Sequence, residues 1–142
     1  MKSSLSHLPK TNQQQILQVV EIIKEVIPAE KIILFGSYAK GNQVEHKYQI
    51  KDGTTFEYIS DYDILVVLKE IPEKLFNLES AIINRTQKYN APVNLEIHEI
   101  EYINKGLEIG EYFFIDIINE GIVLFDTDNL KFAKPRELSA EE

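Results

Sequence analysis

The stretch KIILFGSYAKG, residues 31–41, decides the fold because it joins a continuous apolar run to an abrupt Gly-Ser corner. A short strand of uninterrupted apolar residues is typical of a sheet that is covered on both faces. The glycine and serine that follow end this run and open what reads as a short helix. We therefore predict a buried strand over residues 31–35, a corner at Gly36-Ser37 and a small helix after it.

A second buried strand is predicted by ILVVL at residues 64–68, which follows Asp61-Tyr62-Asp63. Residues i and i+2 of a strand point to the same side, so the two carboxylates are expected to project together. Like charges beside an apolar run are costly unless something neutralises them. Mg²⁺ does so readily, since it prefers carboxylate and phosphate oxygens. The alternative interpretation is an aspartate-rich strand start that faces solvent.

The Gly-Ser corner offers a complementary feature. A junction between a strand and a helix presents free backbone N–H groups that suit a phosphate. Gly36 allows a close backbone approach because it lacks a side chain, and the Ser37 hydroxyl can donate to a phosphate oxygen. Lys40 lies one turn later and is a further candidate for phosphate binding. An ordinary turn and a solvated lysine remain the alternatives.

The remaining periodicities predict an α/β domain. A helix is expected from Thr11 to Pro28, begun by a Thr11–Gln14 capping box, and another helix is expected to start at Pro72 and include Tyr89 on its apolar side. Alternation over residues 93–98 predicts a strand with one polar face. A last helix is expected over roughly 107–120, with a final strand at 122–125.

Domain organisation follows from the same patterns. Residues 1–10 read as a flexible leader, residues 11–126 as one domain, and residues 42–60 as a hairpin insertion that turns at Lys51-Asp52-Gly53. Residues 127–142 are expected to be a tail or the start of a helical domain. The last five residues have capping-box spacing, which favours a helix start, although a frayed tail fits equally.

Composition narrows the class of protein. The 142 residues carry 15 basic and 23 acidic side chains, for a net charge of −8, and no cysteine. This balance argues against a nucleic-acid-binding face, which needs clustered lysine and arginine. No apolar run reaches the roughly 20 residues that cross a bilayer, and the N-terminus has no signal-peptide pattern. A cytoplasmic protein without membrane contact is expected.

Taken together, GSYAKG and SDYDILVV resemble the GS-x-x-x-G…D-x-D signature of nucleotidyltransferases, in the minimal and kanamycin-nucleotidyltransferase-like branch of the DNA polymerase β superfamily. The resemblance implies a small mixed sheet with helices packed mainly on one face. It also implies Mg²⁺-dependent transfer of a nucleoside monophosphate, AMP being expected from ATP, to a hydroxyl of a small molecule or a protein. Gly36, Ser37 and Lys40 would bind phosphates, while Asp61 and Asp63 would bind two Mg²⁺ ions.

The resemblance also implies a third carboxylate on the strand at residues 93–98, as metal ligand and base. Asn94 stands at its usual place, and Glu96 lies on the same face about 7 Å further along. Glu96 is therefore the expected third catalytic and metal-binding residue beside Asp61 and Asp63. The displaced carboxylate leaves open an alternative, a non-catalytic, antitoxin-like module that binds a nucleotide or a partner.

The stretch from Asn104 to Asp126 resembles nucleotidyltransferase domains that are fused to a helical domain of the higher eukaryote and prokaryote nucleotide-binding (HEPN) type. The partners implied are a nucleoside triphosphate, an unidentified hydroxyl acceptor, and a HEPN-type domain or a second copy of the chain.

Overall fold

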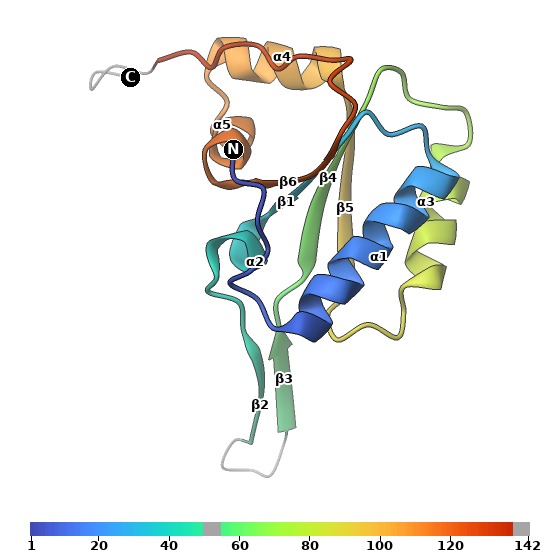
Figure 1. Cartoon of the computed structure of the whole chain (residues 1–142), viewed down its shortest axis with the longest axis vertical. Helices are drawn as coiled ribbons and strands as arrows, with labels where there is room; N and C mark the ends of the chain where they lie inside the picture. The colour runs from blue at the N-terminus through green and yellow to red at the C-terminus, as the bar shows by residue number, and fades with distance from the viewer. Residues whose placement is uncertain (50–54, 138–142) are drawn as a thin grey trace.

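The computed structural model describes residues 1–49 and 55–137, and of residues 45–49 and 55–58 it describes the backbone alone. A central sheet separates two layers of helices (Figure 1). The elements are, in chain order, α1 (Lys10–Val26), β1 (Lys31–Phe35), α2 (Gly36–Lys40), β2 (Glu45–Gln49), β3 (Thr55–Ile59), β4 (Tyr62–Leu68), α3 (Leu75–Arg85), β5 (Val93–Glu99), α4 (Ile100–Ile109), α5 (Tyr112–Glu120) and β6 (Ile122–Asp126).

The sheet is mixed and has the strand order β5-β4-β1-β6. β1 pairs antiparallel with both β4 and β6, whereas β4 pairs parallel with β5 through the crossover of α3. The expected hairpin is confirmed, since β2 and β3 form a separate antiparallel pair. Its expected turn at Lys51-Asp52-Gly53 lies outside the described residues. The α/β class and the mixed sheet are therefore as the sequence predicts.

Helices cover both faces of this sheet, not mainly one. Ile32, Leu34 and Val66 face α1 and α3, while Ile33 and Leu65 face α4 and α5. The two helix layers lie on opposite sides of the strands in Figure 1. A run without polar interruptions buries apolar side chains on both faces, so each face needs a cover. The expectation of one helical face came from the family resemblance and is corrected by this arrangement.

Two helix starts differ from the expectation. The N-cap of α1 is Pro9, and no side chain caps the helix, so Thr11 lies within the first turn and forms no capping box. Proline suits a helix start because its fixed φ is already helical and it has no N–H to leave unpaired. Helix α3 begins after Lys74, whose φ is 60°, and ends at Arg85. Tyr89 therefore lies beyond that helix, not on its apolar face.

The last helix of the sequence prediction is two helices. Ile100 to Ile109 forms α4, which follows β5 directly, and α5 starts at Tyr112. Gly110 ends α4 in the left-handed region, at a φ of 83°, where glycine carries no steric penalty. The two helices pack closely at Gly106, where a Cβ would lie 2.6 Å from the buried Phe114 ring. This contact holds α5 against α4.

The first residues contact the domain, although the sequence indicates a flexible leader. Leu5 and Leu8 are buried in the core, and Lys2 pairs with Ile122 of β6. At the other end, the chain after β6 returns along α4. There the Asn104 side chain accepts a hydrogen bond from the Ala133 amide at 2.7 Å. The helix start expected at residues 138–142 lies outside the described residues.

Within residues 1–49 and 55–137, none of the helices has the length and apolar character that a bilayer crossing requires.

Substituting Gly106→Ala is expected to lower the free energy of unfolding. Alanine gains up to about 1 kcal/mol over glycine inside a helix, but overpacking a filled core costs about 1–3 kcal/mol. We expect a net loss of about 1 kcal/mol in equilibrium urea unfolding. Glu108→Ala, on the exposed side of the same helix, is the control. A Gly106→Ala variant as stable as that control would contradict close packing at this position.

Candidate functional site

The Gly-Ser corner and the aspartates meet because β1 and β4 are neighbours. Their antiparallel register places Phe35, the last residue of β1, opposite Asp63. Gly36 follows at a φ of 73°, and a Cβ on it would overlap the Asp63 carboxylate. A glycine is therefore required here for two reasons, its backbone conformation and the lack of space. The predicted proximity of Gly36 and Asp63 is what the structure shows.

A cleft of about 470 Å³ opens beside this corner, and we call it the carboxylate cleft. Its lining consists of Ser37, Asn42, Val44, Ile59, Ser60, Asp61 and Asp63. The base of the hairpin forms one wall. The Val44 amide donates to the Ser60 hydroxyl at 2.8 Å, and the Ser60 amide donates to the Val44 carbonyl at 2.8 Å. These bonds hold the two ends of the insertion together directly before Asp61.

Asp63 lies between its strand neighbour and the corner. The Asn94 amide donates to Asp63 Oδ1 at 2.9 Å from the paired position on β5. Burial raises the pKa of the Asp63 carboxyl above its usual value, and the hydrogen bond from Asn94 opposes that shift. The negative charges of Asp61 and Glu96 raise the pKa further. The charged form of Asp63 is thus disfavoured in the protein alone, first by burial and then by the neighbouring negative charges.

Glu96 has a different environment. It lies on the same face of β5 as Asn94 but is not part of the cleft lining. His98 Nε2 is 3.1 Å from Glu96 Oε2, and the His98 ring stacks on Tyr102 at a centroid distance of 5.0 Å. The structure therefore places Asn94, and not Glu96, in contact with Asp63. Glu96 affects Asp63 through its charge.

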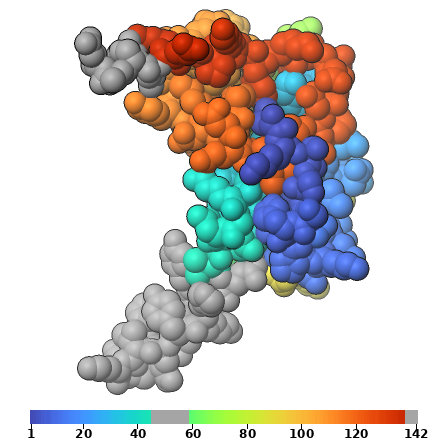
Figure 2. Space-filling view, turned by 60° about the vertical axis from the view of Figure 1, so that its left-hand side comes forward, coloured from blue at the N-terminus to red at the C-terminus, as the bar shows by residue number. Residues whose placement is uncertain are grey.

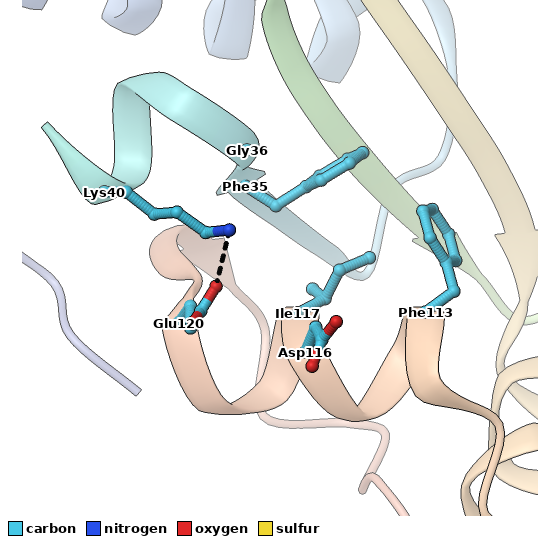
Figure 3. Close-up of a pocket in the computed structure, with 7 residues that line it drawn as sticks. All are labelled: Phe35, Gly36, Lys40, Phe113, Asp116, Ile117 and Glu120. Atoms are coloured by element: carbon cyan, nitrogen blue, oxygen red, sulfur yellow. Dashed lines mark ion pairs between the residues drawn. The ribbon is translucent and has the colours of Figure 1, made fainter. Parts of the chain in front are cut away.

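Lys40 points away from the carboxylate cleft. Its ammonium group pairs with Glu120 of α5 at 3.1 Å, as the dashed line in Figure 3 marks. It thereby closes one side of a cavity of about 160 Å³ that we call the α2–α5 pocket. The lining consists of Phe35, Gly36, Lys40, Phe113, Asp116, Ile117 and Glu120. Of the residues predicted to bind phosphate, only Ser37 lines the carboxylate cleft itself.

The donor set of the cleft fits a hard divalent cation. Asp61 and Asp63 line the same space, and no lysine, arginine or histidine among the described residues forms an ion pair with either. An uncompensated carboxylate pair of this kind favours Mg²⁺ or a similar ion. Within residues 1–49 and 55–137, no group of three His, Cys, Asp or Glu side chains is arranged to hold a metal. Among the described residues, the cleft offers two carboxylates and room for ligand oxygens.

Some residues that line the two cavities were not predicted from the sequence as site residues. Asn42 and Ser60 line the cleft only because the hairpin ends meet there. Asp116 and Glu120 face α2 because α5 folds back over the end of β1. No sequence pattern assigns any of the four to the site, although Ser60 directly precedes the aspartate pair in SDYDILVV.

No protein-family model and no curated protein matches the chain. Among solved structures, a toxin–antitoxin MntA–HpeT mutant is 18% identical over 78% of this chain and 72% of its own, with a TM-score of 0.48. A toxin–antitoxin structure with AMP-PNP is 17% identical over 82% and 75%, with a TM-score of 0.47. A Sulfolobus solfataricus protein described as a nucleotidyltransferase is 22% identical over 86% and 92%, with a TM-score of 0.42. Likenesses at this level do not assign the chain to a family.

Asp63→Asn is expected to stabilise the fold near neutral pH in metal-free buffer. The pKa of Asp63 is raised in the folded state, so its contribution to stability is complete below the unfolded pKa. That contribution is lost as pH rises through the folded value, starting from about pH 4. The variant has no carboxyl group to ionise at this position. The difference between its free energy of unfolding and that of the wild type should therefore grow with pH.

Urea unfolding of both proteins across that pH window, with EDTA present, measures the trend. Glu21→Gln, on α1 and far from the cleft, controls for loss of one negative charge. If the free energy of unfolding of the wild type rises relative to that of the Asp63→Asn variant as pH rises, the assigned environment of Asp63 is wrong.

Proposed function

We propose that this chain is a Mg²⁺-dependent nucleotidyltransferase that transfers a nucleoside monophosphate, AMP being expected, from a nucleoside triphosphate to a hydroxyl. The observation that carries the proposal is the carboxylate cleft. Asp61 and Asp63 share it with Ser37, directly beside the glycine corner. Two uncompensated carboxylates next to a hydroxyl and a glycine backbone suit a metal-bound polyphosphate better than any other common ligand.

Each residue has a defined task in this proposal. Asp61 and Asp63 would hold Mg²⁺, which when bound neutralises phosphate charge and polarises the attacked phosphorus centre. The Ser37 hydroxyl would donate to a phosphate oxygen, and the missing side chain at Gly36 leaves room for the Asp63 carboxylate at the corner. Asn94 orients Asp63 through its hydrogen bond. Positioning and charge neutralisation of this kind supply most of the catalysis in phosphoryl transfer.

The transfer itself forms one bond and breaks another. The acceptor hydroxyl oxygen bonds to the α-phosphorus as the bond to the pyrophosphate oxygen breaks, and pyrophosphate leaves. The hydroxyl proton needs an acceptor on this face of the sheet. Glu96 is the carboxylate available, and its bond with His98 gives it a fixed orientation. The acceptor hydroxyl belongs to a small molecule or to a protein.

A second function, nucleotide binding without turnover, is favoured by one observation. Asn94 occupies the strand position beside Asp63, where the resemblance leads us to expect a third carboxylate. An amide there contributes no negative charge to the cleft. If Glu96 does not take over the role, the domain would hold a nucleotide as a regulatory, antitoxin-like module.

Binding of ATP is expected to require Mg²⁺. Isothermal titration calorimetry of the full chain should show affinity at least about tenfold higher with Mg²⁺ than with EDTA, a difference of about 1.4 kcal/mol. Asp61→Asn and Asp63→Asn should each remove most of that difference, whereas Glu21→Gln should retain it. Equal affinity of the wild type for ATP with and without Mg²⁺ would contradict the assignment of Asp61 and Asp63 as Mg²⁺ ligands.

Two substitutions on β5 separate transfer from binding. If Glu96 serves the reaction, Glu96→Gln should lower the transfer of α-labelled nucleotide by at least about a hundredfold while ATP still binds. If the displaced carboxylate is what prevents turnover, Asn94→Asp should create activity that the wild type lacks. Assays use the full chain with a panel of small-molecule and protein hydroxyl acceptors. Should both variants behave like the wild type, neither residue has the proposed role.

A further inference from the structure

An exposed apolar patch lies on α4 and α5. Tyr102, Ile109, Tyr112 and Phe113 are 56%, 69%, 65% and 39% exposed. Tyr102 and Ile109 are seven residues apart, which places them on the same side of α4. Tyr102 and Phe113 both contact the Phe114 ring, with centroids 5.8 and 5.3 Å away. The four side chains thus belong to one surface, which we call the α4–α5 face.

The same part of the chain is acidic. Residues 99–120 contain six acidic residues and one lysine, whereas the whole chain has a net charge of −8. Lys105 pairs with Glu101 at 3.3 Å. Among the described residues, Glu108, Glu111 and Asp116 form no ion pair. Exposed apolar side chains and carboxylates without an ion pair thus occur on the same two helices and the turn between them.

The α2–α5 pocket adjoins this face and indicates what the face can bind. Phe113 belongs to both, and Figure 3 shows it on the same helix as Asp116 and Ile117, which also line the pocket. Lys40 reaches across the pocket with its aliphatic stem near the apolar lining and its ammonium on Glu120, 3.1 Å away. A basic side chain is thus already bound here by a carboxylate. Asp116 offers a second carboxylate at the same rim.

We propose that the α4–α5 face docks a protein partner through a segment that combines lysine or arginine with apolar side chains. Such a segment would bury the exposed aromatic and aliphatic groups and pair with Glu108, Glu111 and Asp116. Charge decides against the other occupants. A second copy of this chain, a nucleic acid and an anionic membrane are all negative and would be repelled by this face.

In the space-filling view of Figure 2, the orange segment of α4 and α5 lies directly above the cyan segment of α2. A partner on the α4–α5 face would thus lie near the corner at Gly36, which also lines the α2–α5 pocket. The docking proposal goes beyond the proposed function and does not rest on it. It is tested by binding in the absence of nucleotide.

Three fluorescent synthetic peptides of equal length test the chemistry of this face on the full chain. One has lysine and leucine at helical spacing, the second has glutamate in place of lysine, and the third has serine in place of leucine. By fluorescence anisotropy, only the lysine–leucine peptide should bind saturably, and its affinity should fall as salt is raised. Its binding should perturb amide NMR signals of α4 and α5.

Matched double variants locate the binding. Two double variants should each lower the affinity for the lysine–leucine peptide by about tenfold. One combines Ile109→Ser with Tyr112→Ser, and the other combines Glu108→Gln with Asp116→Asn. Leu17→Ser with Glu21→Gln removes one exposed apolar and one acidic group from α1 and should bind like the wild type. Circular dichroism checks that each variant is folded. Equal binding by all the proteins, equal binding of the glutamate peptide, or NMR changes centred on α1 and α3 would overturn the proposal.

Discussion

The contact between Gly36 and the Asp63 carboxylate is the constraint on which the rest of the site depends. It exists because β1 and β4 pair in a register that sets Phe35 opposite Asp63. The glycine leaves no side chain between the helix start and the carboxylate, so a phosphate at the corner and a cation on the aspartates can share one space. A shift of one residue in this register would turn Asp63 to the other face of the sheet.

The two faces of the sheet have separate tasks. The α1–α3 side is filled by apolar side chains and holds the strands in register. The α4–α5 side is filled only in part, and its strand residues near the corner are polar, among them Asp63 and Asn94. A site can form there because α4 and α5 pack over one part of the face and leave the strand starts open. The same two helices carry the exposed apolar side chains for which we propose a protein partner.

The position of Asn94 connects the two functional hypotheses. Its amide holds Asp63 in place and adds no charge, which keeps the raised pKa of that carboxyl from rising further. Glu96 is turned to His98 and acts on the cleft at longer range. This strand thus carries an amide that hydrogen-bonds Asp63 at one position and, at the next position on the same face, the carboxylate that we propose as proton acceptor. A site with its third carboxylate beside the aspartates would combine these roles in one residue.

The sequence by itself determined the strands, the corner and the aspartate pair, because each depends on neighbours in the chain. The uninterrupted run at residues 31–35 predicts a strand covered on both faces, and the i, i+2 spacing of Asp61 and Asp63 predicts a shared side. Only the tertiary structure decided where Lys40 points, since its partner Glu120 is brought near by the packing of α5, whereas Glu96 and His98 are i, i+2 neighbours on one strand. The break at Gly110 and the acidic face beside the pocket likewise follow from how α4 and α5 fold back on the sheet. Periodicity reports which side of an element is apolar, but it does not report which element lies opposite.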